Sequence, residues 1–134
     1  MAQVLELANV TTGYASSTVV RDVSLAIGEH EIVALVGKNG MGKTSLLKSI
    51  LGFLPAWRGS VHLKGRDITR LAPHHRRRLG VSLVPQEQAL FQDLTVRENL
   101  RLGLLGDKGF DERLDDIAGW FPVLTNRLNQ RAGT

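Results

Sequence analysis

One glycine-rich loop in this sequence carries recognisable chemistry. Residues 37–44 read Gly-Lys-Asn-Gly-Met-Gly-Lys-Thr, and they lie between an apolar run at 32–36 and an apolar pattern of helical spacing. Glycines allow a tight turn in which successive backbone N–H groups converge at the start of a helix, where the helix dipole also favours negative charge. The spacing and its context therefore predict a phosphate-binding loop.

The two side chains at the end of this loop can complete a nucleotide site. In such loops the lysine, here Lys43, reaches the β- and γ-phosphates, and the hydroxyl group at the position of Thr44 binds Mg²⁺. A glycine-rich turn with a solvated lysine is the simpler alternative. That alternative does not explain why an apolar run precedes the loop and a helical pattern follows it, whereas a phosphate-binding loop requires both. We therefore expect nucleotide phosphates and Mg²⁺ as ligands.

Length and composition limit the class of protein. The sequence has 134 residues, 43% hydrophobic and 22% charged, as expected for about one globular domain. No apolar run is long enough to span a bilayer, and the first residues do not resemble a secretory leader. Cysteine is absent, which excludes disulfides and thiolate metal sites, and the four histidines lack the spacing of metal ligands. We expect a protein of the cytoplasm.

A basic cluster at residues 74–78, His-His-Arg-Arg-Arg, contributes to a net charge of +4. Such a cluster can contact phosphates or an anionic surface. However, no aromatic residues interleave with it, and Pro73 suits the first position of a short helix. We favour a solvated helix face and expect no nucleic-acid function.

Two kinds of strand are predicted around the loop. Loose alternation of apolar and polar residues predicts antiparallel strands at 4–10 and 23–27 and a further short strand at 60–64. Nearly continuous apolar runs predict buried parallel strands at 31–36 and 81–84. The first of these runs leads directly into the phosphate-binding loop.

Three longer segments have helical patterns. Residues 43–52 follow the loop, and residues 111–121 carry apolar side chains at helical spacing. Residues 95–105 begin with Thr95, and Glu98 three residues later makes the pattern of a capping box. We therefore expect an α/β fold with an antiparallel part, a partial parallel sheet and flanking helices.

Gln86 and Glu87 follow the predicted strand at 81–84. Ligands of open α/β sheets gather at the carboxyl ends of the strands, so these side chains are expected to face the same site as Lys43. Triphosphate hydrolysis also needs a carboxylate directly after a second buried strand. No run of four aliphatic residues precedes an acid here, and Asp107 lies at the end of a predicted helix. The residues alone therefore predict phosphate binding without a complete catalytic set.

Together these motifs resemble the ATP-binding subunits of ABC transporters, most closely those of branched-chain amino-acid and urea importers. Residues 37–44 match the Walker A motif, and residues 84–86, Val-Pro-Gln, resemble the Q-loop. Residues 94–100, Leu-Thr-Val-Arg-Glu-Asn-Leu, resemble the stretch downstream of it, and the segment 121–134 resembles the amino-acid importer branch. The fold implied is the P-loop NTPase nucleotide-binding domain of ABC type, of which residues 1–134 would be the N-terminal part.

The resemblance also implies the roles of single residues. Tyr14 occupies the place of the aromatic residue that stacks on adenine, and Gln86 that of the glutamine which contacts Mg²⁺ and the attacking water. Mg²⁺ is thus assigned to Thr44 and Gln86, and Gln86 takes the catalytic role. The implied nucleotide contacts are Tyr14, Gly37, Asn39, Gly40, Gly42, Lys43, Thr44 and Ser45.

The partners implied are the transmembrane permease subunits of an importer and a second ATP-binding subunit, at the cytoplasmic face of the membrane. The intact parent would be an ATP hydrolase, whereas this sequence lacks the signature motif, Walker B and the switch histidine. The residues 86–91, Gln-Glu-Gln-Ala-Leu-Phe, differ from the Glu-Gly of many branched-chain members, which leaves the solute open. Of these, residues 89–91 are either core or part of a groove for a helix of the permease.

Two other functions compete with this one. A non-catalytic nucleotide-binding or interaction module would explain the missing carboxylate. A small P-loop kinase would need a lid with catalytic arginines, and the pattern at 94–100 argues against it.

Overall fold

The computed structural model describes residues 3–86, 89–104 and 109–134. The chain forms two compact units, Met1–Leu83 and Val84–Thr134. Within the described ranges no helix is long and apolar enough to cross a membrane. The predictions made for Glu87, Leu105 and Asp107 lie outside the described residues.

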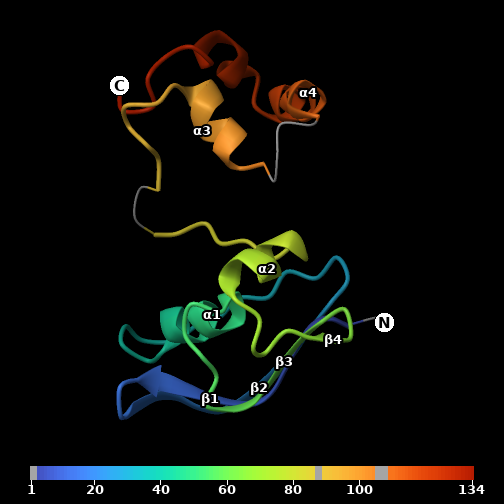
Figure 1. The fold of residues 1–134 in the computed structure, drawn as a ribbon, viewed down its shortest axis with the longest axis vertical. Coiled ribbons are helices and arrows are strands. Elements are labelled where there is room, and N and C mark those ends of the chain that lie inside the picture. The colour runs from blue at the N-terminus through green and yellow to red at the C-terminus, as the bar shows by residue number, and fades with distance from the viewer. Residues whose placement is uncertain (1–2, 87–88, 105–108) are drawn as a thin grey trace. The chain divides into compact units, whose positions relative to one another are not determined.

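The first unit contains a four-stranded antiparallel sheet in the order β2-β1-β3-β4 (Figure 1). Its strands are β1 Gln3–Tyr14, β2 Ser17–Gly28, β3 Arg58–Leu63 and β4 Arg66–Asp67. Leu7 of β1 pairs with Leu25 of β2 and with Val61 of β3, which places apolar side chains on one face. The two predicted antiparallel strands and the further short strand are confirmed, and β1 and β2 are longer than the alternation indicated.

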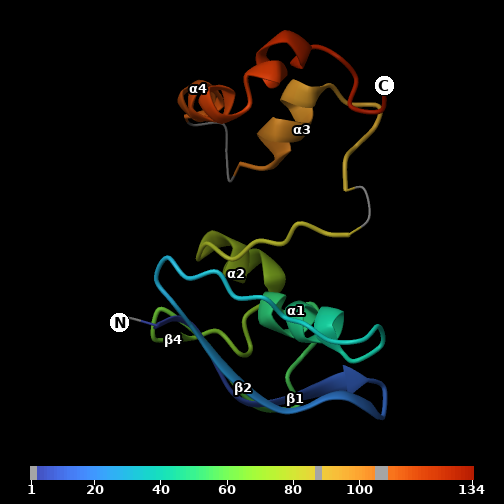
Figure 2. The same cartoon turned by 180° about the vertical axis from the view of Figure 1, so that it is seen from behind.

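Helix α1, Lys43–Leu51, packs on the inner face of this sheet (Figure 2). Leu46 and Ile50 of α1 belong to one buried cluster with residues of β1, β2 and β3. Burial of each such side chain contributes about 1.5–3 kcal/mol. The sheet residues of the cluster are Leu7, Val10, Val20, Val61 and Leu63. The helix predicted at 43–52 is confirmed, and Gly52 ends it in the left-handed conformation.

Helix α2, Pro73–Arg78, starts at the predicted proline. Its Arg76 is only 2% exposed, so the prediction of a solvated face is wrong for this residue. The guanidinium donates from Nη1 to the carbonyl oxygens of Ser49 and Ile50, both at 2.7 Å. It also donates from Nε to Leu71 at 2.8 Å and from Nη2 to Thr69 at 2.7 Å.

The reason for this burial lies at the end of α1. The last carbonyl groups of a helix lack intrahelical donors, and a guanidinium offers five N–H groups in a rigid fork. Burial lowers the pKa of Arg76, but it stays charged because its ordinary pKa is so high. The positive charge also lies at the negative end of the α1 dipole.

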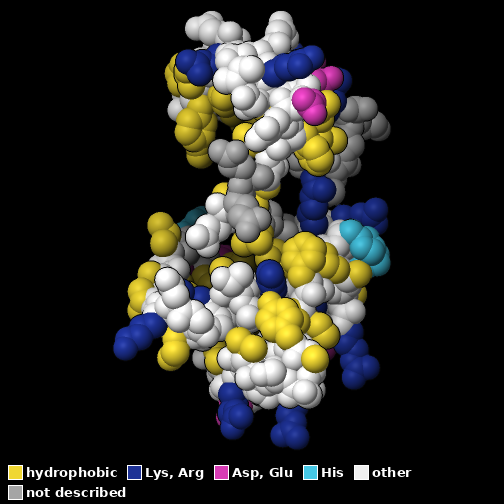
Figure 3. Space-filling view, turned by 90° about the vertical axis from the view of Figure 1, so that its left-hand side faces the viewer, with side chains coloured by type: hydrophobic (Ala, Val, Ile, Leu, Met, Phe, Trp, Pro, Cys, Tyr) yellow, Lys and Arg dark blue, Asp and Glu magenta, His cyan; other side chains and the backbone are white. Residues whose placement is uncertain are grey.

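The parallel strands predicted at 31–36 and 81–84 are not formed. Neither run pairs with another strand among the described residues, and Ile32 is 99% exposed. On the first unit, Figure 3 shows apolar side chains at the surface beside Lys and Arg side chains. A strand needs a neighbour to accept its ladder hydrogen bonds, and an apolar pattern alone does not supply that neighbour. The mixed α/β class is nevertheless as predicted.

The second unit contains α3 Val96–Leu102, α4 Phe110–Trp120 and the 3₁₀ helix η1 Pro122–Arg127. The predicted capping box is confirmed. The Glu98 N–H donates to Thr95 Oγ1 at 3.2 Å, and the Thr95 N–H donates to Glu98 Oε2 at 2.8 Å. The Thr95 hydroxyl also donates to Glu98 Oε2, at 2.8 Å. The hydrogen bond from the Thr95 backbone N–H, and after it the one from the Thr95 hydroxyl, lower the pKa of the Glu98 carboxyl group.

We predict that Arg76→Met lowers the free energy of unfolding by about 3 kcal/mol or more, because four carbonyl groups lose a charged donor. Urea denaturation of residues 1–134 measures this change. Arg78→Met, on the exposed side of the same helix, is the matched control and should stay within about 0.5 kcal/mol. Equal effects of the two substitutions would contradict the role assigned to Arg76.

Candidate functional site

The phosphate-binding loop predicted at 37–44 joins an extended stretch to the first turn of α1. Gly40 and Gly42 have φ angles of 83° and 85°, in the left-handed region that favours glycine. At Gly42 a Cβ atom would also lie 2.9 Å from the carbonyl oxygen of Val19 and 3.2 Å from Cγ2 of Val20. The loop can therefore sit this close to β2 only with glycine at position 42.

The N-terminus of α1 is free to bind an anion. Its N-cap, Gly42, offers no side-chain hydrogen bond, and its first turn contains no acidic residue. The first intrahelical bond of α1 runs from the Leu46 N–H to the Gly42 carbonyl at 2.8 Å. The N–H groups of Lys43, Thr44 and Ser45 have no acceptor among the described residues, and such groups at the positive end of a helix dipole bind phosphates.

Lys43 reaches back across the loop. Its Nζ donates to the carbonyl oxygens of Gly37 at 2.6 Å and Lys38 at 2.8 Å. An ammonium group has three donors, so one remains for a phosphate oxygen. The two hydrogen bonds fix the positive charge over the loop before any ligand binds.

The other loop residues differ in their exposure. The side chains of Asn39 and Thr44 are exposed, so the Thr44 hydroxyl is accessible to a metal ion at the mouth of the loop. The Ser45 side chain is buried, so its backbone N–H is the group that the phosphate-site prediction uses. The roles of these three residues stay predictions.

Tyr14 lies at the end of β1, where it pairs with Ser17 across a tight hairpin. Its side chain is 47% exposed. Val19 of the same hairpin contacts Gly42, so this end of the sheet is next to the phosphate-binding loop. An exposed aromatic ring in that place suits the predicted contact with a nucleobase, although no described contact tests it.

Gln86 is exposed and lies in the second unit, whereas Lys43 lies in the first. Its predicted contacts with Mg²⁺ and water therefore stay predictions. No three His, Asp or Glu side chains gather as metal ligands in the part of the chain that the structure describes. The Thr44 hydroxyl and the phosphates of a nucleotide are the donors that fit Mg²⁺ in this loop.

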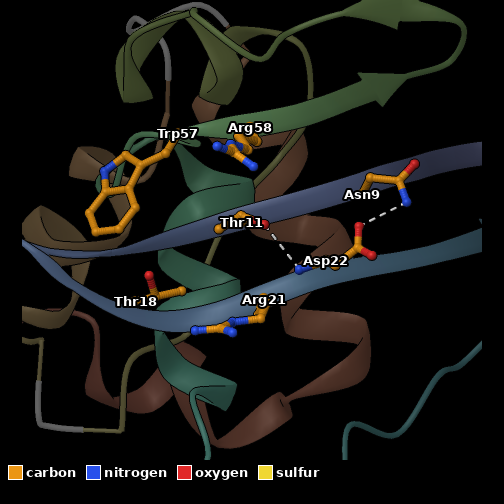
Figure 4. A pocket seen from close by; sticks show the side chains of 7 residues that line it. All are labelled: Asn9, Thr11, Thr18, Arg21, Asp22, Trp57 and Arg58. Carbon is orange, nitrogen blue, oxygen red and sulfur yellow. Dashed lines mark hydrogen bonds between the residues drawn. The ribbon is translucent and has the colours of Figure 1, made fainter.

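Sequence reasoning missed a second feature of the first unit. A pocket of about 610 Å³ opens on the outer face of the sheet, away from α1 (Figure 4). Only the polar residues that alternate with the core residues of β1, such as Asn9 and Thr11, could have indicated it. The residues that line it are Asn9, Thr11, Thr18, Arg21, Asp22, Trp57 and Arg58.

Comparisons with known proteins agree with this geometry. A sequence model described as ABC transporter matches residues 20–133. The chain is 37% identical, over 132 residues, to a probable branched-chain amino acid transport ATP-binding protein, LivF, of Archaeoglobus fulgidus. The match covers 97% of this chain and 56% of that protein.

Other matches carry different transport names. The chain is 40% identical over 97 residues to the lipopolysaccharide export system ATP-binding protein LptB of Haemophilus influenzae, covering 72% of this chain and 40% of that one. A crystal structure of a nucleotide-free ATP-binding cassette from an ABC transporter matches with a TM-score of 0.84 and 24% identity. It is matched over 98% of this chain and 58% of its own length, which confirms the predicted fold type. The chain thus spans between 40% and 58% of the length of these relatives.

We predict that Tyr14→Ala weakens MgATP binding by about 1–3 kcal/mol, the usual value of stacking one base on an aromatic ring. Calorimetric titration of residues 1–134 with MgATP and with inorganic tripolyphosphate measures the effect. Tyr14→Phe keeps the ring and should bind ATP as the unchanged protein does. Equal losses for ATP and for tripolyphosphate would mean that Tyr14 only supports the hairpin.

Proposed function

Since the chain belongs to the ABC transporter family through its ATP-binding domain, we propose that it binds ATP and Mg²⁺ as the energy-coupling subunit of an importer. One observation carries this proposal. The uncapped N–H groups at the start of α1 and the Lys43 ammonium, held by Gly37 and Lys38, form a preorganised site for phosphate. No acidic side chain in the first turn of α1 opposes the negative charge.

Each group in the loop has a defined task in this proposal. The N–H groups of residues 43–45 hold phosphate oxygens, and the third N–H of Lys43 donates to the β- or γ-phosphate. The Thr44 hydroxyl binds Mg²⁺, which neutralises charge on the transferred phosphoryl group when it is bound. Tyr14 orients the adenine, and Gln86 contacts Mg²⁺ and the attacking water.

The family match supports a proposal for partners and location. We assign the chain to the cytoplasmic face of a membrane, where the permease subunits of an importer and a second ATP-binding subunit would contact it. Hydrolysis would need a metal-binding carboxylate, which the sequence does not present after a buried strand. The activity proposed for residues 1–134 themselves is therefore nucleotide binding.

Branched-chain amino acids are the solutes that we propose for the parent transporter. The relative named for this transport aligns over 132 residues, whereas the one named for lipopolysaccharide export aligns over 97. The alignment with the former covers 97% of this chain, and the segment at 121–134 resembles the amino-acid importer branch. A non-catalytic interaction module remains the second candidate function, because of the missing carboxylate. The family match weighs against a small kinase.

We predict that Lys43→Ala weakens MgATP binding about a hundredfold or more, because the substitution removes the positive charge and its charge-assisted hydrogen bond to the β- or γ-phosphate. Calorimetry on residues 1–134 measures the binding, and urea denaturation checks that the fold is kept. Lys48→Ala, an exposed lysine in the last turn of the same helix, is the matched control and should bind normally. Binding by Lys43→Ala within a few-fold of the unchanged protein would refute the assignment.

A further inference from the structure

The outer-face pocket, defined above by its seven lining residues, belongs to a different face of the sheet from the phosphate-binding loop. Its polar residues on β1, Asn9 and Thr11, flank Val10, which points into the core beneath α1. In Figure 4 the labelled side chains lie in front of the strands and α1 lies behind them. The pocket therefore has no part in the phosphate site.

The pocket is rich in hydrogen-bond donors. Arg21 of β2 and Arg58 of β3 lie on opposite sides of Thr11, because β1 runs between these two strands (Figure 4). Among the residues that the structure describes, neither guanidinium has an ion-pair partner or a side-chain hydrogen bond. The hydroxyl groups of Thr11 and Thr18 and the indole N–H of Trp57 add further donors.

The single carboxylate among the lining residues, that of Asp22, already accepts a hydrogen bond within the sheet. Asp22 Oδ1 accepts a hydrogen bond from Asn9 Nδ2 at 2.9 Å, and the Asp22 N–H donates to Thr11 Oγ1 at 3.0 Å. Asn9 and Asp22 have positive φ angles, of 51° and 53°, and they lie where the register of β1 and β2 shifts. Their hydrogen bond therefore stabilises this bulge in the strand pair. One acid against two arginines leaves the pocket with a net positive charge.

The backbone at Trp57 is held in place at the edge of the pocket. The backbone N–H of Trp57 donates to the carbonyl oxygen of Thr11 at 2.8 Å, and the Thr12 hydroxyl donates to the carbonyl oxygen of Pro55 at 2.7 Å. The indole is nevertheless 40% exposed. An exposed ring that lines the same pocket as two arginines can stack on a flat group, and the guanidinium groups can bind an acidic one.

From this arrangement we propose that the outer-face pocket binds a small anion that carries an aromatic ring. The acidic group lies between Arg21 and Arg58, and the ring packs against Trp57. The acid is a phosphate or a carboxylate, since both match the bidentate geometry of a guanidinium. This site is independent of the proposed nucleotide site, and either can fail without the other.

The test uses residues 1–134 with the substitution Trp120→Phe. Of the two tryptophans in the sequence, only Trp57 then remains to report fluorescence. AMP and benzoate are titrated by calorimetry, and AMP also by Trp57 fluorescence, with adenosine and inorganic phosphate as half-ligands. We expect saturable binding of at least one of the two aromatic acids, with quenching of Trp57 by AMP if the phosphate is accepted. Each half-ligand should bind about tenfold more weakly or not at all.

Three variants locate the binding. Arg21→Gln with Arg58→Gln should weaken it about tenfold or more, because charged hydrogen bonds are lost. Arg66→Gln with Arg70→Gln makes the same change in net charge at exposed arginines outside the pocket and should have little effect. Lys43→Ala should also leave it unchanged, which separates this site from the phosphate loop.

Three results would overturn the proposal. They are no saturable binding of either acid, equal losses in the two double-arginine variants, and loss of binding in Lys43→Ala. The first would show that Arg21 and Arg58 are solvated surface residues. The second would indicate a general effect of charge, and the third would place the ligand at the phosphate loop. Urea denaturation of each variant checks that the fold is intact.

Discussion

The packing of α1 against the antiparallel sheet is the constraint on which the rest of the first unit depends. Leu46 and Ile50 bury its apolar side against three strands. At the N-terminal end Gly42 approaches β2 so closely that no other residue fits without displacement, and at the C-terminal end Arg76 donates to the last carbonyl groups. A helix fixed at both ends presents its free N–H groups in one place, which a phosphate site requires.

The two faces of the sheet carry different chemistry. The inner face supports α1 and the loop in which Lys43 is already bound to carbonyl oxygens of its own loop. The outer face carries the arginines and the indole of the second pocket. Alternation along β1 separates the two, because Val10 points inward while Asn9 and Thr11 point outward. A substitution on one face therefore need not disturb the other.

Local signals in the sequence were predictive where a contact spans only a few residues. The glycine-rich turn before α1, the helix α1 itself and the Thr95–Glu98 capping box all involve neighbours in the chain, and all three form where we expect them. The runs at 31–36 and 81–84 were assigned to strands because they are apolar, but strand pairing is a non-local contact that such a pattern does not specify. Arg76 was misassigned for the same reason, since its acceptors at Ser49 and Ile50 lie 27 and 26 residues away.

The central claim is that ATP phosphates bind at the start of α1. Hydrogen–deuterium exchange of residues 1–134, with and without saturating MgATP, tests it most directly because it locates the protected amides. We predict slower exchange at residues 43–45, whose N–H groups would donate to phosphate, and no change at residues 60–63 of the sheet. Binding of MgATP without protection at 43–45 would contradict the account.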